Sequence, residues 1–204
     1  KVKEVNLDVW QKVKQNGFKV MCLTTDTQHL GKRESDVRNR FQLPSHLTLA
    51  VYEKYRSKSK TQEINKSQNE SALAEYVRNH KDNTIDWSTI GYVKQKSGLK
   101  VFAKGVMSYE DTIQALKNGA DGIFVSNHGA RQLDTTPATI QVLESVMQAI
   151  RDFGRKVPVF FDGGIRHGED ILKAIVLGAD VVFIGRPILW GLAYDGQKGV
   201  ELVL

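Results

Sequence analysis

The second half of the chain alternates short apolar runs with segments whose apolar residues recur every three or four positions. The apolar runs lie at 100–104, 122–126, 157–161 and 180–184. They are almost continuously hydrophobic, which is typical of strands buried on both faces of a parallel sheet. The segments between them have the spacing of amphipathic helices, as Leu143 and Val146 show in one segment and Leu172 and Val176 in the next. This order predicts an α/β fold built from repeated strand–helix units.

The first quarter of the chain adds one more unit of the same kind. Leu7, Trp10 and Val13 fall on one face of a predicted helix, Gly17 ends it, and 20–24 reads as a strand. We therefore expect five strands, each opening into a polar loop at its carboxyl end.

One region does not follow this alternation of predicted strands and helices. Residues 55–71 are mostly Lys, Ser, Gln, Asn and Glu, with one isoleucine. Such a segment cannot bury enough apolar surface to fold alone, so we interpret it as a mobile polar loop inserted after the first strand. Short helices are expected at 72–79 and, capped by Asp86, around Trp87 to Val93. Ser108, followed three residues later by Asp111, predicts the cap of the next helix.

Composition limits the class of protein. The chain has 204 residues with a net charge of +6, which suits one soluble domain or part of a larger one. No apolar stretch is long enough to span a membrane, and a single cysteine excludes an internal disulfide. The basic residues are dispersed and no aromatic residues interleave with them, so a solvated surface is a better explanation of the charge than nucleic-acid binding. No metal site is predicted.

Polar or charged residues follow every predicted strand. They are Asp26, Lys104, His128 with Arg131, Asp162 with Arg166, and Arg186 after Gly185. Ligands of parallel α/β sheets and barrels bind at the carboxyl ends of the strands. The recurrence after all five strands therefore predicts a functional site at this edge.

Two glycine-rich segments follow the last two strands, at 162–166 and 184–187. Glycines allow backbone N–H groups to approach a phosphate, and a helix N-terminus and arginines favour its charge. In α/β barrels a phosphate site commonly follows strands seven and eight. Tight strand–helix turns are the alternative explanation, but the two segments together favour phosphate binding.

The segment 126–134 carries the clearest chemistry. His128 can exchange a proton near neutral pH, and Arg131 can hold a carboxylate through two hydrogen bonds. Asp26 could pair with His128 and stabilise its protonated form. Lys104 ends a buried strand, so its ammonium needs a partner, for which an anionic cofactor would serve. A structural histidine and a surface lysine are the plainer alternatives.

At these residues the sequence resembles the FMN-dependent α-hydroxy-acid oxidase and dehydrogenase family, and within it the glycolate (2-hydroxy-acid) oxidase branch. The similarity covers nearly the whole chain outside 55–71. The matching segments are 24–27, 30–34, 38–41, 103–105, 126–134, 137–140, 162–166 and 183–187. Of these, the Ser-Asn-His-Gly-Ala-Arg-Gln run that begins at Ser126 is the most specific.

The resemblance implies a fold, a reaction and a set of catalytic residues. The fold would be an (β/α)8 TIM barrel, present here as its strands four to eight. The reaction would be oxidation of a small (S)-2-hydroxy acid to the 2-oxo acid, with oxygen reduced to hydrogen peroxide. His128 would be the catalytic base, and Asp26 would orient it. Arg131, helped by Arg33, would bind the substrate carboxylate, and Lys104 would stabilise the reduced flavin.

The resemblance also implies an FMN site. The residues that would bind the cofactor are Thr24, Lys104, Ser126, Asp162, Gly163, Gly164, Arg166, Gly185 and Arg186. Thr24 and Ser126 would contact the flavin, Asp162 the ribityl chain, and the glycines and arginines the phosphate.

Every matched motif belongs to the C-terminal part of that family, so we expect residues 1–204 to be the C-terminal part of one such barrel. Three strands of the barrel would be absent, and the chain alone would bind FMN weakly. An inactive or partner-binding fragment of the fold, and a lactate or mandelate-type dehydrogenase, remain alternatives. The resemblance further implies a peroxisomal location, with a cytoplasmic one as the alternative, and a tetramer for the full-length protein.

Overall fold

The computed structural model describes residues 2–39, 44, 46–47 and 84–204. The predicted polar loop at 55–71 and the short helix expected at 72–79 lie outside the described residues.

The centre of the fold is one parallel sheet of five strands. They are β1 (Val20–Thr24), β2 (Lys100–Val106), β3 (Gly122–Val125), β4 (Val159–Asp162) and β5 (Val181–Phe183). The spatial order β1-β2-β3-β4-β5 follows the order in the chain, and every neighbouring pair is parallel. All five predicted strands are confirmed, and all their carboxyl ends lie at one edge of the sheet.

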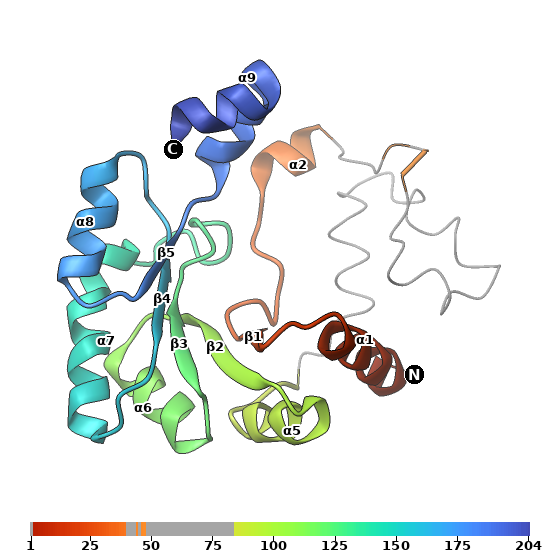
Figure 1. Ribbon diagram of the computed structural model, residues 1–204, viewed down its shortest axis with the longest axis vertical. Coiled ribbons are helices and arrows are strands. Elements are labelled where there is room, and N and C mark those ends of the chain that lie inside the picture. Colours follow the sequence, from red (N-terminus) through yellow and green to blue (C-terminus); the bar gives the residue numbers. More distant parts are fainter. Residues whose placement is uncertain (1, 40–43, 45, 48–83) are drawn as a thin grey trace.

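Helices surround this sheet on its outer side (Figure 1). They are α1 (Val2–Gln15), α2 (Glu34–Arg38), α5 (Ser88–Ser97), α6 (Tyr109–Lys117), α7 (Thr139–Phe153), α8 (Gly168–Val176) and α9 (Arg186–Val203). α5 to α8 run along the outside of the strands, and α1 packs beside α5. α2 and α9 lie at the upper end of the view in Figure 1, beyond the carboxyl ends of the strands.

The caps of two helices test the expectations from the sequence. Ser108 precedes α6, and its side chain accepts a hydrogen bond from the backbone N–H of Asp111, as predicted. The cap assigned to Asp86 was wrong by one residue, because α5 begins at Ser88 with Trp87 at the N-cap position. Asp86 instead accepts hydrogen bonds from the hydroxyl groups of the first turn of α5.

The outward-facing side chains of the strands form the main hydrophobic core. Val101, Ile123, Val159 and Phe161 are fully buried, in the same cluster as Leu143 of α7. Burying a large aliphatic side chain contributes about 1.5–3 kcal/mol, so this cluster is what holds the helices on the sheet.

The inward-facing side chains form a second apolar layer, made of phenylalanines. Phe102, Phe124, Phe160 and Phe183 come from four adjacent strands. Ring centroids lie 4.7 Å apart for Phe102 and Phe160, and 4.9 Å apart for Phe124 and Phe183. Such spacing is favourable for aromatic pairs. Two residues further along three of these strands the side chains become polar, so this layer is the floor of the polar carboxyl edge.

Within the part of the chain that the structure describes, β1 and β5 each pair on one side only, so both edges of the sheet are open there. Apolar side chains near β5 are correspondingly exposed, including Val181 and Phe183 of the strand itself. The apolar face predicted for α8 is mostly exposed as well, since Leu172 and Val176 are 63% and 76% accessible. In the described parts of the chain no helix combines the length and apolarity that a membrane span requires.

Candidate functional site

A histidine and an aspartate from two loops meet at the carboxyl edge of the sheet. His128 follows β3, and its Nδ1 lies 3.3 Å from both carboxylate oxygens of Asp26, which follows β1. The two residues are 102 positions apart in the chain. An ionised carboxylate only accepts hydrogen bonds, so the pairing places a proton on Nδ1 and leaves Nε2 free to act as a base. The predicted pairing is confirmed.

The backbone that carries His128 adopts an uncommon conformation. His128, Gly129 and Ala130 all have φ near +60°, a region that non-glycine residues rarely occupy. Asn127 supports this turn, because its side-chain oxygen accepts a hydrogen bond from the backbone N–H of Ala130. Backbone strain of this kind is concentrated at functional sites, where it fixes the direction of a side chain.

Gly105 makes the close approach of Asp26 possible. Its φ is +103°, and a Cβ atom at this position would lie 2.7 Å from Cβ and Cγ of Asp26. A real side chain would therefore push Asp26 away from His128. The glycine belongs to β2, so three consecutive strands of the sheet contribute to the geometry of this pair.

Two arginines lie near the same loops. Burial lowers the pKa of Arg33, the positive charge of Arg131 lowers it further, and Asp36 opposes both effects. The Nε atom of Arg33 is buried and has no hydrogen-bond partner among the described residues. Two like charges held together, with one buried donor unpaired, can bind an anion such as a carboxylate.

Lys104 lies at the centre of the inner face. Its Nζ donates a hydrogen bond of 2.9 Å to Oγ of Ser126 and lies 3.6 Å from Oδ2 of Asp162. It also lies 5.0 Å from the centre of the Phe124 ring, within the range of a cation–π interaction. Its side chain is 18% exposed, so it is not a surface lysine. Thr24 is its partner in the register of β1 and β2.

The last residue of β4 has an unpaired acceptor, and the segment that follows it has exposed backbone. The Oδ1 atom of Asp162 is buried without a hydrogen-bond partner among the described residues. Gly163 and Gly164 both have positive φ, and Gly163 packs against Thr139. At Gly164, and at Gly185 after β5, the position of a missing Cβ has no atom within 4 Å. These two glycines therefore present open backbone at the carboxyl edge of the sheet.

The two arginines predicted to share a phosphate have different partners here. Arg186 donates a hydrogen bond of 2.8 Å to the carbonyl oxygen of Gly129, in the loop of His128. Arg166 lies over the ring of Trp190, at 5.2 Å, and donates to the carbonyl oxygen of Ile165. Both arginines follow a strand at the carboxyl edge of the sheet, as predicted, but their side chains do not contact each other.

The sequence did not assign roles to three residues that the structure places in the site. Gly105 makes room for Asp26, Phe124 supports Lys104, and Gln132 bonds to the loop after β1. The sequence could have pointed to Gly105 and Gln132 as site residues, because both lie within segments that match the family. Their contacts cross from one strand to another, and those contacts were not readable from the pattern.

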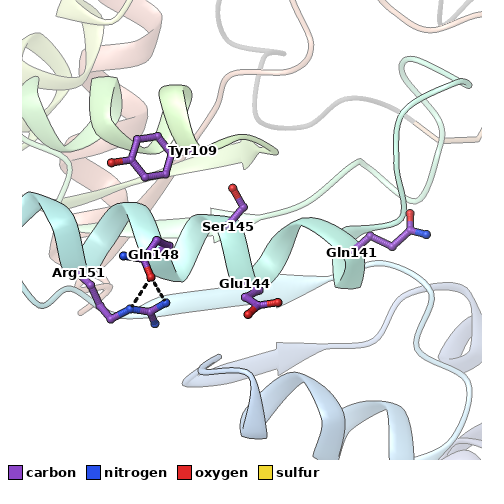
Figure 2. Close-up of a pocket in the computed structure, with 6 residues that line it drawn as sticks. All are labelled: Tyr109, Gln141, Glu144, Ser145, Gln148 and Arg151. Atoms are coloured by element: carbon purple, nitrogen blue, oxygen red, sulfur yellow. Dashed lines mark hydrogen bonds between the residues drawn. The ribbon is translucent and has the colours of Figure 1, made fainter.

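An open hollow lies elsewhere, on the outer surface between α6 and α7 (Figure 2). Its lining residues are Tyr109, Gln141, Glu144, Ser145, Gln148 and Arg151. Arg151 is tied to Gln148 by two hydrogen bonds, and Tyr109 bonds to Asp152. None of the predicted site residues lines it, so we place the site at the carboxyl edge of the sheet.

A parallel α/β sheet with a histidine–aspartate pair, two neighbouring arginines and a half-buried lysine at its carboxyl edge has the arrangement of the functional edge of an α/β barrel. The family model described as "FMN-dependent dehydrogenase" matches residues 1–204. The chain belongs to this family.

Curated relatives and solved structures agree with this assignment. The chain is 44% identical over 204 residues to 2-hydroxyacid oxidase 1 of Mus musculus, covering 100% of this chain and 54% of the relative. It is 48% identical over 188 residues to glycolate oxidase 3 of Oryza sativa subsp. indica, covering 92% of this chain and 49% of the relative. The chain thus spans about half the length of these relatives.

Among solved structures, mandelate oxidase with (S)-4-hydroxymandelic acid has a TM-score of 0.86 and 35% identity, over 98% of this chain and 54% of that one. A soluble mutant of the membrane-associated (S)-mandelate dehydrogenase of Pseudomonas putida has a TM-score of 0.78 and 34% identity, over 98% and 54%. The predicted fold class is confirmed: the five strands are part of an (β/α)8 TIM barrel.

Proposed function

We propose that this chain carries the catalytic residues of an FMN-dependent oxidase that converts a small, glycolate-like (S)-2-hydroxy acid to the 2-oxo acid. The single observation that carries the proposal is the contact of His128 with Asp26. Arg33 and Arg131 interact with each other on the two loops that carry this pair, and two guanidinium groups suit a substrate with a carboxylate. Membership of the FMN-dependent family supports the same reaction.

The residues present fit FMN. The buried, unpaired Oδ1 of Asp162 can accept a hydrogen bond from a hydroxyl group of the ribityl chain. The open backbone at Gly164 and Gly185 leaves space for a phosphate. Lys104 places a positive charge beside Ser126, where a flavin that becomes anionic on reduction would need one. When bound, FMN would take up the two electrons that leave the substrate and pass them to oxygen, which with the two protons released by the substrate would give hydrogen peroxide.

Each side chain of the site would have its own part in the reaction. Arg131 and Arg33 bind the substrate carboxylate and thereby orient the α-carbon. His128 takes one proton from the substrate at Nε2, and the imidazolium that forms is stabilised by the carboxylate of Asp26. Because Asp26 already fixes the ring through Nδ1, the base is oriented before the substrate binds.

We assign the cofactor site to the residues that the resemblance indicated. They are Thr24, Lys104, Ser126, Asp162, Gly163, Gly164, Arg166, Gly185 and Arg186. Arg186 donates to the carbonyl oxygen of Gly129, and Arg166 lies over the ring of Trp190. Each guanidinium has five N–H donors, so we infer that both can still donate to a phosphate.

We also propose that residues 1–204 are the C-terminal part of one barrel and that the missing strands are needed for full activity. The edges of β1 and β5, which have no partner strand among the described residues, and the exposed Phe183 favour this. The same edges are the observation behind a second candidate, a partner-binding fragment without activity of its own. For the full-length protein we propose a peroxisomal location and a homotetramer, testable by imaging and by analytical ultracentrifugation.

The test is a visible absorption spectrum of the chain with added FMN, then with glycolate in the absence of oxygen. We expect weak binding by residues 1–204 alone. In the full-length protein we expect tight binding and bleaching of the flavin by glycolate. FMN binding without bleaching by glycolate would contradict the proposed substrate. Failure of the full-length protein to bind FMN would contradict the proposed function as a whole.

A further inference from the structure

One side chain connects the two loops that carry the site. The amide nitrogen of Gln132, in the loop after β3, donates hydrogen bonds to the carbonyl oxygens of Asp26, at 2.9 Å, and His29, at 2.8 Å. Its Oε1 accepts a hydrogen bond of 3.3 Å from the backbone N–H of Gly31. All three bonds go to the backbone of the loop after β1, more than 100 positions away in the chain.

The chemistry of these partners demands an amide. Two of them are carbonyl oxygens, which need donors, and the third is an N–H group, which needs an acceptor. Only the side chain of glutamine or asparagine has two donors and an acceptor on one planar group. A glutamate here could still accept from Gly31, but it would face two carbonyl oxygens without a donor.

The two loops are also in close backbone contact. A Cβ atom at Gly31 would collide with the carbonyl oxygens of Arg131 and Gln132. Gly31 lies two residues before Arg33, and its contact is with the backbone of Arg131 and Gln132. The contact between the loops therefore brings the positive guanidinium groups of Arg33 and Arg131 close together. Their repulsion opposes the closure as long as no anion lies between them, so a separate attraction must hold the loops together.

We propose that Gln132 is a positioning residue that clamps the loop after β1 onto the loop after β3. At one end it fixes the backbone of Asp26, whose carboxylate meets His128. At the other it fixes Gly31, and with it the direction of Arg33. The clamp thus presents the base and the carboxylate-binding pair to one substrate, and in this respect it rests on the proposed function.

Hydrogen–deuterium exchange tests the clamp without any need for activity. The variants are Gln132→Met, which removes all three bonds, and Gln148→Met as the matched control on the outer surface of α7 (Figure 2). In the full-length, flavin-bound protein we expect residues 25–33 to exchange about tenfold faster in Gln132→Met, because the loop opens more often. The control should leave this segment unchanged. Unchanged exchange in Gln132→Met would overturn the proposal.

Steady-state kinetics test the consequence for the site. We expect Gln132→Glu and Gln132→Met to lower kcat and raise KM together, with a loss of about 10–100-fold in kcat/KM, because both His128 and Arg33 lose their alignment. Gln148→Glu controls for the added charge. A lower melting temperature with unchanged kcat and KM would mean that Gln132 is merely structural and would overturn the proposal.

The two measurements separate this inference from the proposed function. If the wild-type protein fails to oxidise 2-hydroxy acids, the proposed function is wrong. The exchange of residues 25–33 would still decide whether Gln132 holds the loops together. If the wild type is active and Gln132→Met retains its kcat/KM, the clamp is wrong and the proposed function stands.

Discussion

The two ends of the sheet use the same residue type in opposite ways. At the amino end, Asp121 accepts from Lys94 at 2.6 Å and from the backbone N–H of Val101 at 2.9 Å, so both its carboxylate oxygens are paired. Asp180 makes one similar interaction, because its carboxylate accepts a hydrogen bond of 2.7 Å from the backbone N–H of Val159. At the carboxyl end, Asp162 has one buried oxygen without a partner among the described residues.

This difference separates structure from function. A carboxylate whose two oxygens both accept hydrogen bonds from the protein stabilises the fold and has no oxygen left for a ligand. A buried oxygen without a hydrogen-bond partner costs stability, and such an atom is expected where a ligand supplies the missing donor. The carboxyl end also holds the left-handed His128 and the unpaired Nε of Arg33. We therefore expect substitutions at the amino end to change stability, and substitutions at the carboxyl end to change activity.

The largest effect should come from removing the base. His128→Gln is expected to lower kcat by about 10²–10⁴-fold, because proton transfer from the substrate loses its acceptor. FMN content and melting temperature should stay close to the wild type. Stopped-flow bleaching of the flavin by glycolate, without oxygen, measures the effect, and the exposed His46→Gln is the matched control. Bleaching at the wild-type rate in His128→Gln would contradict the assignment.

The next largest effect should come from Gly105. In Gly105→Ala the new Cβ would lie 2.7 Å from Asp26, so we expect kcat/KM to fall about 10–100-fold as the pair with His128 is displaced. The positive φ adds a loss of about 1–2 kcal/mol of stability.

Gly119→Ala is the matched control for this substitution. Its φ of +92° is similar, and the new Cβ would have no atom within 4 Å. It should lose a comparable amount of stability, measured by chemical denaturation, with unchanged kcat/KM. Equal losses of activity in the two variants would show that backbone strain, rather than contact with Asp26, is responsible.

A smaller, paired effect compares the two ends of the sheet directly. Asp121→Asn should lower the free energy of unfolding by about 1–2 kcal/mol, because an amide places a donor against either Lys94 or Val101. Its kcat should not change. Asp162→Asn should weaken FMN binding about tenfold, because an amide has one acceptor oxygen and cannot accept both from Lys104 and from the ribityl chain. Its loss of unfolding free energy should be smaller than that of Asp121→Asn, because Lys104 keeps its hydrogen bond to Ser126. Urea denaturation measures stability, and flavin titration measures FMN binding. Weaker FMN binding in Asp121→Asn, together with a larger loss of stability in Asp162→Asn, would contradict the comparison.

The smallest effect concerns the helix after β4. Hydrogen bonds from the backbone N–H groups of Arg166 and His167 lower the pKa of Asp170. A carboxyl group with a lowered pKa stabilises the fold above the usual aspartate value, about 3.9, and this contribution is lost as the pH falls through the lower, folded value. The difference in melting temperature between wild type and Asp170→Asn should therefore shrink in acid. Glu169→Gln is the control, and a difference that persists at the lowest pH would contradict this account.

The sequence predicted much of the fold because local patterns carry it. Continuous apolar runs marked all five strands, and the spacing of residues such as Leu143 and Val146 marked α7. Of the two predicted caps, Ser108 was confirmed and Asp86 was misplaced by one residue, since alternative hydroxyl and carboxylate partners lie next to each other at that helix end. The exposure of Leu172 and Val176 could not be predicted, because periodicity shows that a face is apolar but not what covers it.

The sequence by itself determined which chemical groups reach the carboxyl edge of the parallel sheet. Asp162 ends its strand, Lys104 lies in the last part of β2, and Asp26 and His128 follow their strands within three residues. Only the tertiary structure decided which of them meet. Lys104 pairs with Asp162 across β3, Gly105 admits Asp26, and Gln132 clamps one loop onto another. These contacts depend on strand register and loop conformation, which arise from the packing of segments up to 106 residues apart and leave no periodic signal in the chain.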